Sequence, residues 1–236
     1  MERLEAKLIE RKISGQNLPP AQKMTAVPEL FTIGHSTHSW EKFLELLRQH
    51  RIDAVADVRS SPYSQYNPQF NRDSLQRALR DQGIVYVFLG EELGARRSEP
   101  ECYANGRVDY SLIARTPAFI RGLERIIQGA AKKRIAMMCA EKDPLDCHRC
   151  ILVSPQLQKK GINVLHILGD GTLESQEQAE RRLAQKLNIS EGELFCSADE
   201  LVAEAYHVQG EKIAYEQEQP GIVGRAADAG QTRPCQ

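Results

Sequence analysis

The chain has 236 residues, of which 41% are hydrophobic and 27% are charged. These values are typical of a globular protein with one domain of about 150 to 200 residues and short extensions. No apolar run approaches the roughly 20 residues that a membrane-spanning helix needs. The segment from Met1 to Glu5 is too charged for a secretory signal. We therefore expect a cytoplasmic protein without a membrane partner.

The formal net charge of −1 excludes a general electrostatic attraction to nucleic acid. Basic residues outnumber acidic ones in the segment 59–134, and this local excess permits an anionic substrate. The six cysteines are too sparse and irregular for a disulfide scaffold, and three of them lie between positions 139 and 150. Free thiols in a reducing compartment fit this pattern better.

Residues 1–28 combine mixed charge with prolines, and we expect an N-terminal extension to which no chemistry is assigned. From residue 29 onward, apolar runs alternate with amphipathic segments. The predicted strands are 30–33, 54–56 and 84–88, and the predicted helices between them are 39–50 and 71–82. This order predicts a β-α-β-α-β arrangement.

The segment 94–116 is rich in charged and small residues and predicts a long loop that could act as a substrate lid. Thr116 followed by Pro117 is typical of a helix start, and this helix is expected to end near Lys132. The remaining predicted elements are a strand at 134–139, a helix at 147–160 with Asp146 as its N-cap and a kink at Pro155, and a strand at 163–167.

Together these elements predict an α/β fold with a mostly parallel, open sheet of about five strands and flanking helices, in a Rossmann-like three-layer arrangement. The domain is expected to span 29–188. One amphipathic segment, 178–187, precedes its end. Residues 189–236 are expected to form a C-terminal helical segment around Ala198 to Tyr206 and a flexible tail.

Polar residues follow every predicted strand. Because ligands bind beyond the carboxyl ends of parallel strands, these residues are the candidates for a common site. They are Gly34-His35-Ser36, Asp57-Val58-Arg59, Leu89-Gly90, Cys139-Ala140-Glu141, and His166 with Asp170-Gly171. Gly34 would allow a close approach of another backbone beside His35.

The catalytic candidates are Cys147, Glu141, His148 and His35. Cys147 at a helix start, next to His148 and Arg149, has two reasons for a lowered pKa, and the thiolate is the reactive form. Glu141 shares a strand face with Cys139 and could act as a general base. The alternative for Cys147 is an inert capping thiol, and for Cys139 a small core residue.

The candidates for anion binding are Arg59, Arg149, Ser36 and Asp57. Arg59 could simply pair with Asp57 or Glu141, but a guanidinium held by a carboxylate is also a common anion receptor. Phe70 could stack on a base, although core packing is favoured for it.

The motifs resemble those of the domain-of-unknown-function 488 family over about residues 29–188. The resemblance rests on Thr32-Ile33-Gly34-His35-Ser36, Asp57-Val58-Arg59, Asn67-Pro68-Gln69-Phe70, Leu89-Gly90-Glu91-Glu92-Leu93-Gly94, Met138-Cys139-Ala140-Glu141 and Cys147-His148-Arg149. It implies an intracellular α/β domain in which these polar residues are functional, and it implies no particular reaction.

The leading hypothesis is an enzyme that acts on a phosphate-bearing substrate, such as a nucleotide or nucleic-acid end, through Cys, Glu, His and Arg side chains. A second hypothesis is thiol redox chemistry at Cys147 and Cys150. A non-catalytic nucleic-acid-binding module is a further alternative, weakened by the neutral net charge. The oligomeric state stays open.

Metal binding is the remaining alternative. No cofactor is predicted, but Cys139, Cys147, His148 and Cys150, with His35 or His166 added, have the ligand types of zinc or iron. Against this hypothesis, the adjacent residues Cys147 and His148 would point to different sides of a helix.

Overall fold

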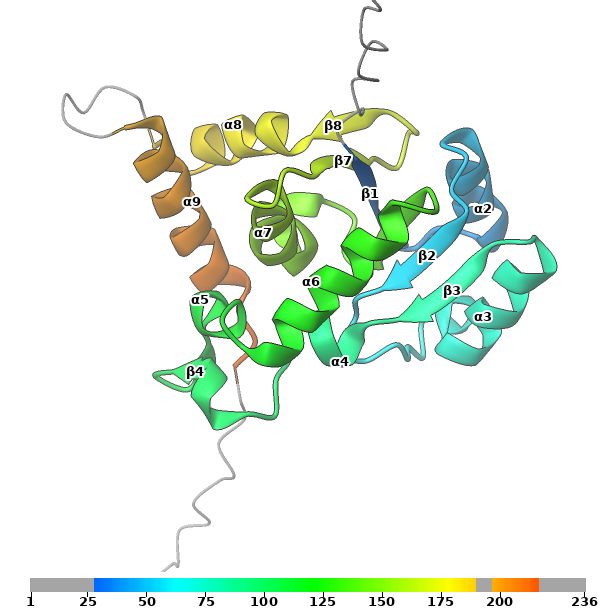
Figure 1. Cartoon of the computed structure of the whole chain (residues 1–236), viewed down its shortest axis with the longest axis horizontal. Coiled ribbons are helices and arrows are strands. Elements are labelled where there is room, and N and C mark those ends of the chain that lie inside the picture. The colour runs from blue at the N-terminus through cyan, green and yellow to red at the C-terminus, as the bar shows by residue number, and fades with distance from the viewer. Residues whose placement is uncertain (1–27, 190–196, 217–236) are drawn as a thin grey trace, which may run out of the picture.

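The structure, a computed structural model, describes residues 28–189 and 197–216. Its centre is a six-stranded sheet in the order β3-β2-β6-β1-β7-β8 (Figure 1). The strands are β1 (Glu29–Gly34), β2 (Ala54–Asp57), β3 (Val85–Phe88), β6 (Ile135–Cys139), β7 (Asn163–Ile167) and β8 (Leu173–Ser175). All neighbours pair in parallel except β7 and β8. The predicted α/β class and mostly parallel sheet are confirmed, and β8 is an addition.

Helices cover both faces of the sheet. Neighbouring strand residues point to opposite faces, so Phe31 packs with α2 (Trp40–Gln49) and α3 (Arg72–Asp81), whereas Leu30 packs with α6 (Pro117–Ala130) and α7 (Ser154–Gln158). Figure 1 shows α6 crossing in front of the sheet. The arrangement has the three layers expected of a Rossmann-like fold.

Side-chain caps explain where several helices begin. The hydroxyl of Ser39 accepts a hydrogen bond from the backbone N–H of Lys42, and that of Thr116 accepts from Phe119. Ser175 forms a capping box at α8 (Gln176–Lys186), and Ser197 forms another at α9 (Ala198–Ile213). The predicted starts near Ser39 and Thr116 are confirmed.

The segment predicted as a long loop contains short elements. They are α4 (Gly90–Leu93) just before it, a 3-10 turn (Pro100–Cys102), the hairpin β4 (Tyr103–Ala104) and β5 (Arg107–Val108), and α5 (Tyr110–Ile113). Asn105 and Gly106 both have positive φ, 53° and 79°. An Asn-Gly pair is the strongest local signal for a tight hairpin. The predicted long loop therefore contains short elements that the sequence does not reveal, because elements of two to four residues leave no periodicity, and its role as a substrate lid stays a prediction.

The predicted helix 147–160 is also different in detail. A 3-10 turn (Pro144–Asp146) is followed by a π-helical turn (Arg149–Val153), which α7 continues. Asp146 is not an N-cap, and its carboxylate accepts from Lys186 and Gln209 instead. Pro155 lacks a backbone N–H, which favours a local change of helix type just before it.

The described part of the C-terminal region packs on the same domain. Helices α8 and α9 share an apolar cluster with the turns at 144–153, which includes Leu145, Ile151, Leu183 and Ala205. The predicted helical segment at 198–206 is thus present and continues to Ile213. The predicted N-terminal extension, up to residue 27, and the predicted flexible tail, from residue 217, lie outside the described residues.

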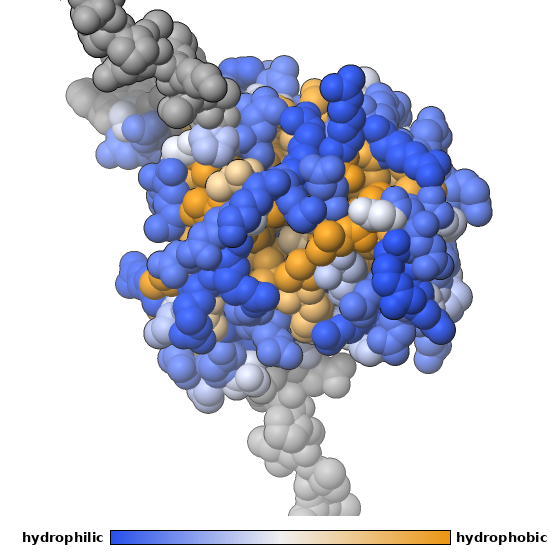
Figure 2. All heavy atoms as spheres, turned by 45° about the vertical axis from the view of Figure 1, so that its right-hand side comes forward, coloured by the Kyte–Doolittle hydropathy of each residue, from blue (hydrophilic) through white to orange (hydrophobic). Residues whose placement is uncertain are grey.

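The outer edge of the sheet carries exposed apolar groups. Val85 on the edge strand β3 is 41% exposed, and Figure 2 shows apolar side chains among polar ones on the face turned forward. Within the described ranges, no helix has both the length and the apolar character that crossing a membrane requires.

Candidate functional site

The carboxyl ends of β1, β2 and β6 meet at one edge of the sheet. The backbone N–H of His35 donates to the Cys139 carbonyl oxygen at 2.9 Å, and that of Val58 donates to the Met138 carbonyl oxygen at 3.1 Å. Ser36, in the left-handed region with a φ of 49°, donates its N–H to Ala140. The structure therefore brings three of the predicted strand-end motifs together.

Arg149 fixes the loop that follows β6. Its side chain is buried, and Nη1 donates to the Glu141 carbonyl oxygen at 2.9 Å while Nη2 donates to that of Lys142 at 3.2 Å. A Cβ added at Gly34 would lie 1.9 Å from the same Glu141 oxygen. Only glycine therefore fits at this position, at the end of β1 and beside the loop.

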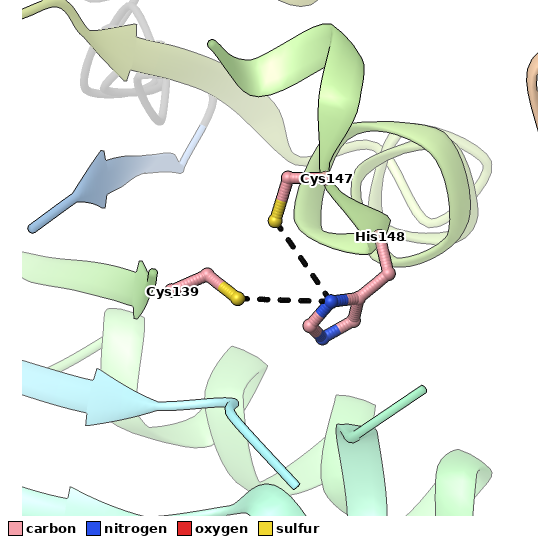
Figure 3. Close-up of side chains that lie close together, drawn as sticks. All are labelled: Cys139, Cys147 and His148. Carbon is pink, nitrogen blue, oxygen red and sulfur yellow. Dashed lines mark hydrogen bonds between the residues drawn. The ribbon is translucent and has the colours of Figure 1, made fainter. Parts of the chain in front are cut away.

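Two thiols and one imidazole form a buried cluster (Figure 3). Nδ1 of His148 lies 3.7 Å from Sγ of Cys139 and 3.8 Å from Sγ of Cys147. The backbone is extended at Cys147 (φ −137°, ψ 139°) and helical at His148 (φ −58°, ψ −23°). This change makes the two adjacent side chains converge, so the sequence-based objection that they point to different sides of a helix is wrong.

A backbone contact fixes the orientation of His148. Its Nε2 lies 3.1 Å from the carbonyl oxygen of Val58. A carbonyl oxygen only accepts, so Nε2 carries a hydrogen, while Nδ1 faces the two sulfurs. The end of β2 thus positions the ring that faces the end of β6.

The two thiols have opposite pKa shifts. Burial disfavours the Cys147 thiolate, but the Cys139 S–H group and the positive charges of Arg149 and His148 outweigh it and hold the Cys147 pKa well below its usual value. The backbone N–H of Arg149 also donates to the Cys147 sulfur at 3.4 Å. The neighbouring Cys147 sulfur and burial both raise the pKa of Cys139. Cys147 is therefore the more acidic of the two thiols.

Glu141 is the polar group beside this cluster that solvent reaches. The residue is exposed, but its carboxyl lies close enough to both thiols for them to affect its pKa. Partial burial and the negative charge of Cys147 raise that pKa. A carboxyl at the open side of a buried thiol pair can exchange protons with groups bound there.

His35, Arg59 and Asp57 form a second network next to the cluster. Arg59 donates to both oxygens of Asp57, to the Phe70 carbonyl oxygen at 2.8 Å, and from Nη1 to Nε2 of His35 at 3.1 Å. Nδ1 of His35 then donates to the Ser36 carbonyl oxygen at 2.9 Å. Both ring nitrogens are occupied, so His35 positions Arg59 in this structure and has no free nitrogen for proton transfer.

Phe70 packs as expected from the favoured interpretation. It is buried, and its ring stacks on His35 with centroids 4.4 Å apart. Tyr86 on β3 donates its hydroxyl to Asp57 at 2.8 Å. Sequence analysis missed Tyr86, which lies inside an apolar run and carries no signal of a polar partner.

Other predicted residues lie apart from the cluster. Cys150 faces Gln176, with Sγ 3.7 Å from Oε1, so the Cys147-x-x-Cys150 pair does not share the site. His166 is buried between Thr32 and Gln176. A second missed residue, Tyr110, packs against the core that contains Cys139 and Cys147. It follows the N-cap Asp109 in the segment interpreted as a loop.

The fold and site define an α/β protein with a buried Cys-Cys-His-Arg cluster at the carboxyl edge of a parallel sheet. Residues 39–154 match the family model described as "Domain of unknown function DUF488". This segment therefore matches the family that the motifs indicated, over a shorter range than the expected 29–188. Searches of curated proteins and of solved structures gave no match.

Proposed function

We propose that the protein is a metal-dependent hydrolytic enzyme, in which Cys139, Cys147 and His148 bind one divalent ion and Glu141 acts as the general base. Zinc suits two thiolates and one imidazole best, and iron is the next choice. The observation that carries the proposal is the convergence of the three ligand atoms, all within 4.8 Å of one another.

The distances match tetrahedral coordination. An ion about 2.3 Å from each sulfur and about 2.0 Å from the nitrogen would set sulfur and nitrogen about 3.5 Å apart. The two distances from Nδ1 are 3.7 and 3.8 Å. An ion therefore fits between these side chains with little movement.

The surroundings of the cluster support the same function. Metal-binding histidines commonly donate their other ring N–H to a carbonyl or carboxylate, which fixes the ring. His148 does so through Val58. The buried Arg149 compensates the negative charge of the thiolates and donates its backbone N–H to Cys147.

Three protein ligands leave one tetrahedral position open, which is typical of catalytic zinc sites. Glu141 would remove a proton from a water molecule bound there. The resulting hydroxide would add to an electrophilic carbon or phosphorus of the substrate, and Glu141 would return the proton to the leaving group.

A second candidate is a metal-free enzyme in which the Cys147 thiolate attacks an anionic substrate. Its support is the buried Nε of Arg149, which has no hydrogen-bond partner among the residues described. Such a donor could bind a phosphate or carboxylate oxygen next to Cys147. The two candidates differ in whether an ion occupies the cluster.

Metal analysis of purified protein tests the proposal. We expect about one zinc or iron per chain in the wild type, and loss of the ion in Cys139→Ser, Cys147→Ser and His148→Gln. Cys150→Ser is the matched control, because Cys150 is equally buried in the same segment but lies outside the cluster. Co²⁺ substitution should add a thiolate charge-transfer band that only the three cluster variants reduce. A wild type that binds neither ion would favour the Cys147 nucleophile.

A further inference from the structure

A large cavity lies between the hairpin β4–β5, helix α5, helix α7 and helix α9. It has a volume of about 1020 Å³, at the upper end of the range for small-molecule sites. Figure 1 shows α5, β4 and the C-terminal end of α9 side by side. These elements lie at the end of the sheet where the C-terminal ends of β2 and β3 are found. The cavity is thus on the same side of the fold as the cluster.

Tyr110 connects the cavity with the cluster. It lines the cavity, and its ring packs against the core that contains Cys139 and Cys147. Its pKa is raised by burial and by the charges of Cys147, Glu141 and Cys139, so its hydroxyl stays protonated and can donate.

The walls of the cavity indicate what it could hold. Apolar and aromatic side chains form one part of the lining, among them Val108, Ile151, Leu152, Pro155, Val202 and Tyr206. Polar and charged residues form the rest, with four carboxylates (Asp109, Glu180, Asp199 and Glu211) and two cations (Arg107 and Lys159). This excess of carboxylates disfavours a highly anionic ligand. The lining suits a molecule with an apolar or aromatic body and polar ends.

We infer that this cavity binds the apolar body of the substrate, whose reacting group extends past Tyr110 to the metal centre. The inference rests on the proposed function and adds the substrate class, an elongated molecule with an apolar or aromatic body. Tyr110 would donate its hydroxyl hydrogen to an oxygen of the reacting group.

Gly210 offers a way to fill the cavity. It lies on α9 in the lining, and a Cβ added there would meet Cδ2 of Tyr110 at 3.4 Å. A tryptophan at this position would occupy the space next to Tyr110. Ala203→Trp, at an exposed lining position, is a second blocking variant that does not depend on tolerance at the buried Gly210. Glu204→Trp, exposed on the same helix and outside the lining, is the control.

The test uses alkyl hydroxamates, which bind metal ions through their head group, with the zinc-loaded full chain. Calorimetry would compare acetohydroxamate with hexano- and octanohydroxamate. We expect the affinity to rise with chain length, by up to about fourfold for each methylene that becomes buried. Gly210→Trp and Ala203→Trp should lose this rise and keep the affinity for acetohydroxamate, whereas Glu204→Trp should behave like the wild type.

The outcomes separate the two proposals. If acetohydroxamate binds zinc-loaded protein but longer chains bind no tighter, or if both blocking variants keep the rise, the cavity does not serve the metal centre and this inference is wrong. If the protein binds no metal, or if acetohydroxamate does not bind the loaded protein, the proposed function fails and this inference fails with it.

Discussion

Nη1 of Arg59 lies 3.1 Å from Nε2 of His35, and a guanidinium can only donate. This contact requires a neutral His35 whose Nε2 accepts. The geometry connects the end of β1 with the end of β2 and keeps Arg59 against Asp57. It also determines how the stability of the protein responds to acid.

The first prediction concerns pH. Burial and Arg59 lower the pKa of His35 to about 4, and burial and Arg149 lower that of His166 to about 3. Unfolded histidines titrate near pH 6.5, so below that pH the unfolded chain binds protons that the folded protein does not. Stability should therefore be full above about pH 6.5 and fall with decreasing pH. The loss between pH 7 and pH 5 should be about 2 kcal/mol for each histidine.

Urea denaturation of metal-free protein at several pH values measures this loss. His35→Gln removes one titrating group and should reduce the pH dependence of the unfolding free energy. The same pH dependence in His35→Gln and in the wild type would show that His35 is not held neutral.

The second prediction concerns Gly34. A methyl group at this position would lie 1.9 Å from the Glu141 carbonyl oxygen, which Arg149 holds in place. Gly34→Ala should therefore destabilise the protein by about 1 to 3 kcal/mol or more and displace the 141–142 loop. Thermal denaturation measures the loss. Gly169→Ala is the control, because its Cβ would lie at an ordinary distance of 3.4 Å from His38, and an equal effect of both changes would contradict the prediction.

The sheet and the convergence of the strand ends could be predicted, because each buried strand leaves an apolar run followed by polar residues. This pattern alone predicts that four residues lie close together, namely Gly34, His35, Arg59 and Cys139. The convergence of Cys147 and His148 could not be predicted, since it depends on a single change from extended to helical backbone. The π-helical turn at Arg149–Val153 leaves no periodic signal either.

Tyr110 shows a different limit of what can be predicted from the sequence. Its role depends on the hairpin and on α9, which lies about 90 positions later in the chain, so no local pattern connects it with the cluster. The hairpin itself had a signal in Asn105-Gly106, whose positive φ values the tight turn requires. The occupied nitrogens of His35 are a further feature that only the packed structure reveals.

The third prediction concerns Arg149. Replacement by lysine keeps the charge but loses the two donors that reach the Glu141 and Lys142 carbonyl oxygens. Because these contacts orient the residues around the cluster, Arg149→Lys should weaken zinc binding by roughly 10- to 100-fold. Competition with a chromogenic chelator measures the affinity. Arg48→Lys is the control, since Arg48 donates to Gln82 in an exposed pair. Unchanged affinity in Arg149→Lys would make this arginine purely structural.

The last prediction compares the reactivity of the two thiols in metal-free protein. Both are almost fully buried, with exposed fractions of 3% for Cys139 and 1% for Cys147, so labelling by iodoacetamide should be slow for both. Although burial opposes ionisation, Cys139, Arg149 and His148 lower the pKa of Cys147, whereas the pKa of Cys139 is raised. Cys147 should therefore react first, because at any given pH a larger fraction of its thiol is ionised than of the Cys139 thiol.

Mass spectrometry after short exposure identifies the labelled residue, and zinc added beforehand should protect both thiols together. Cys102 is the control, because it is buried in the same apolar core but lies outside the cluster, so zinc should not change its labelling. Preferential labelling of Cys139 would contradict the assignment of the thiolate. Protection of only one thiol by zinc would contradict shared coordination, because an ion bound by both sulfurs must block both.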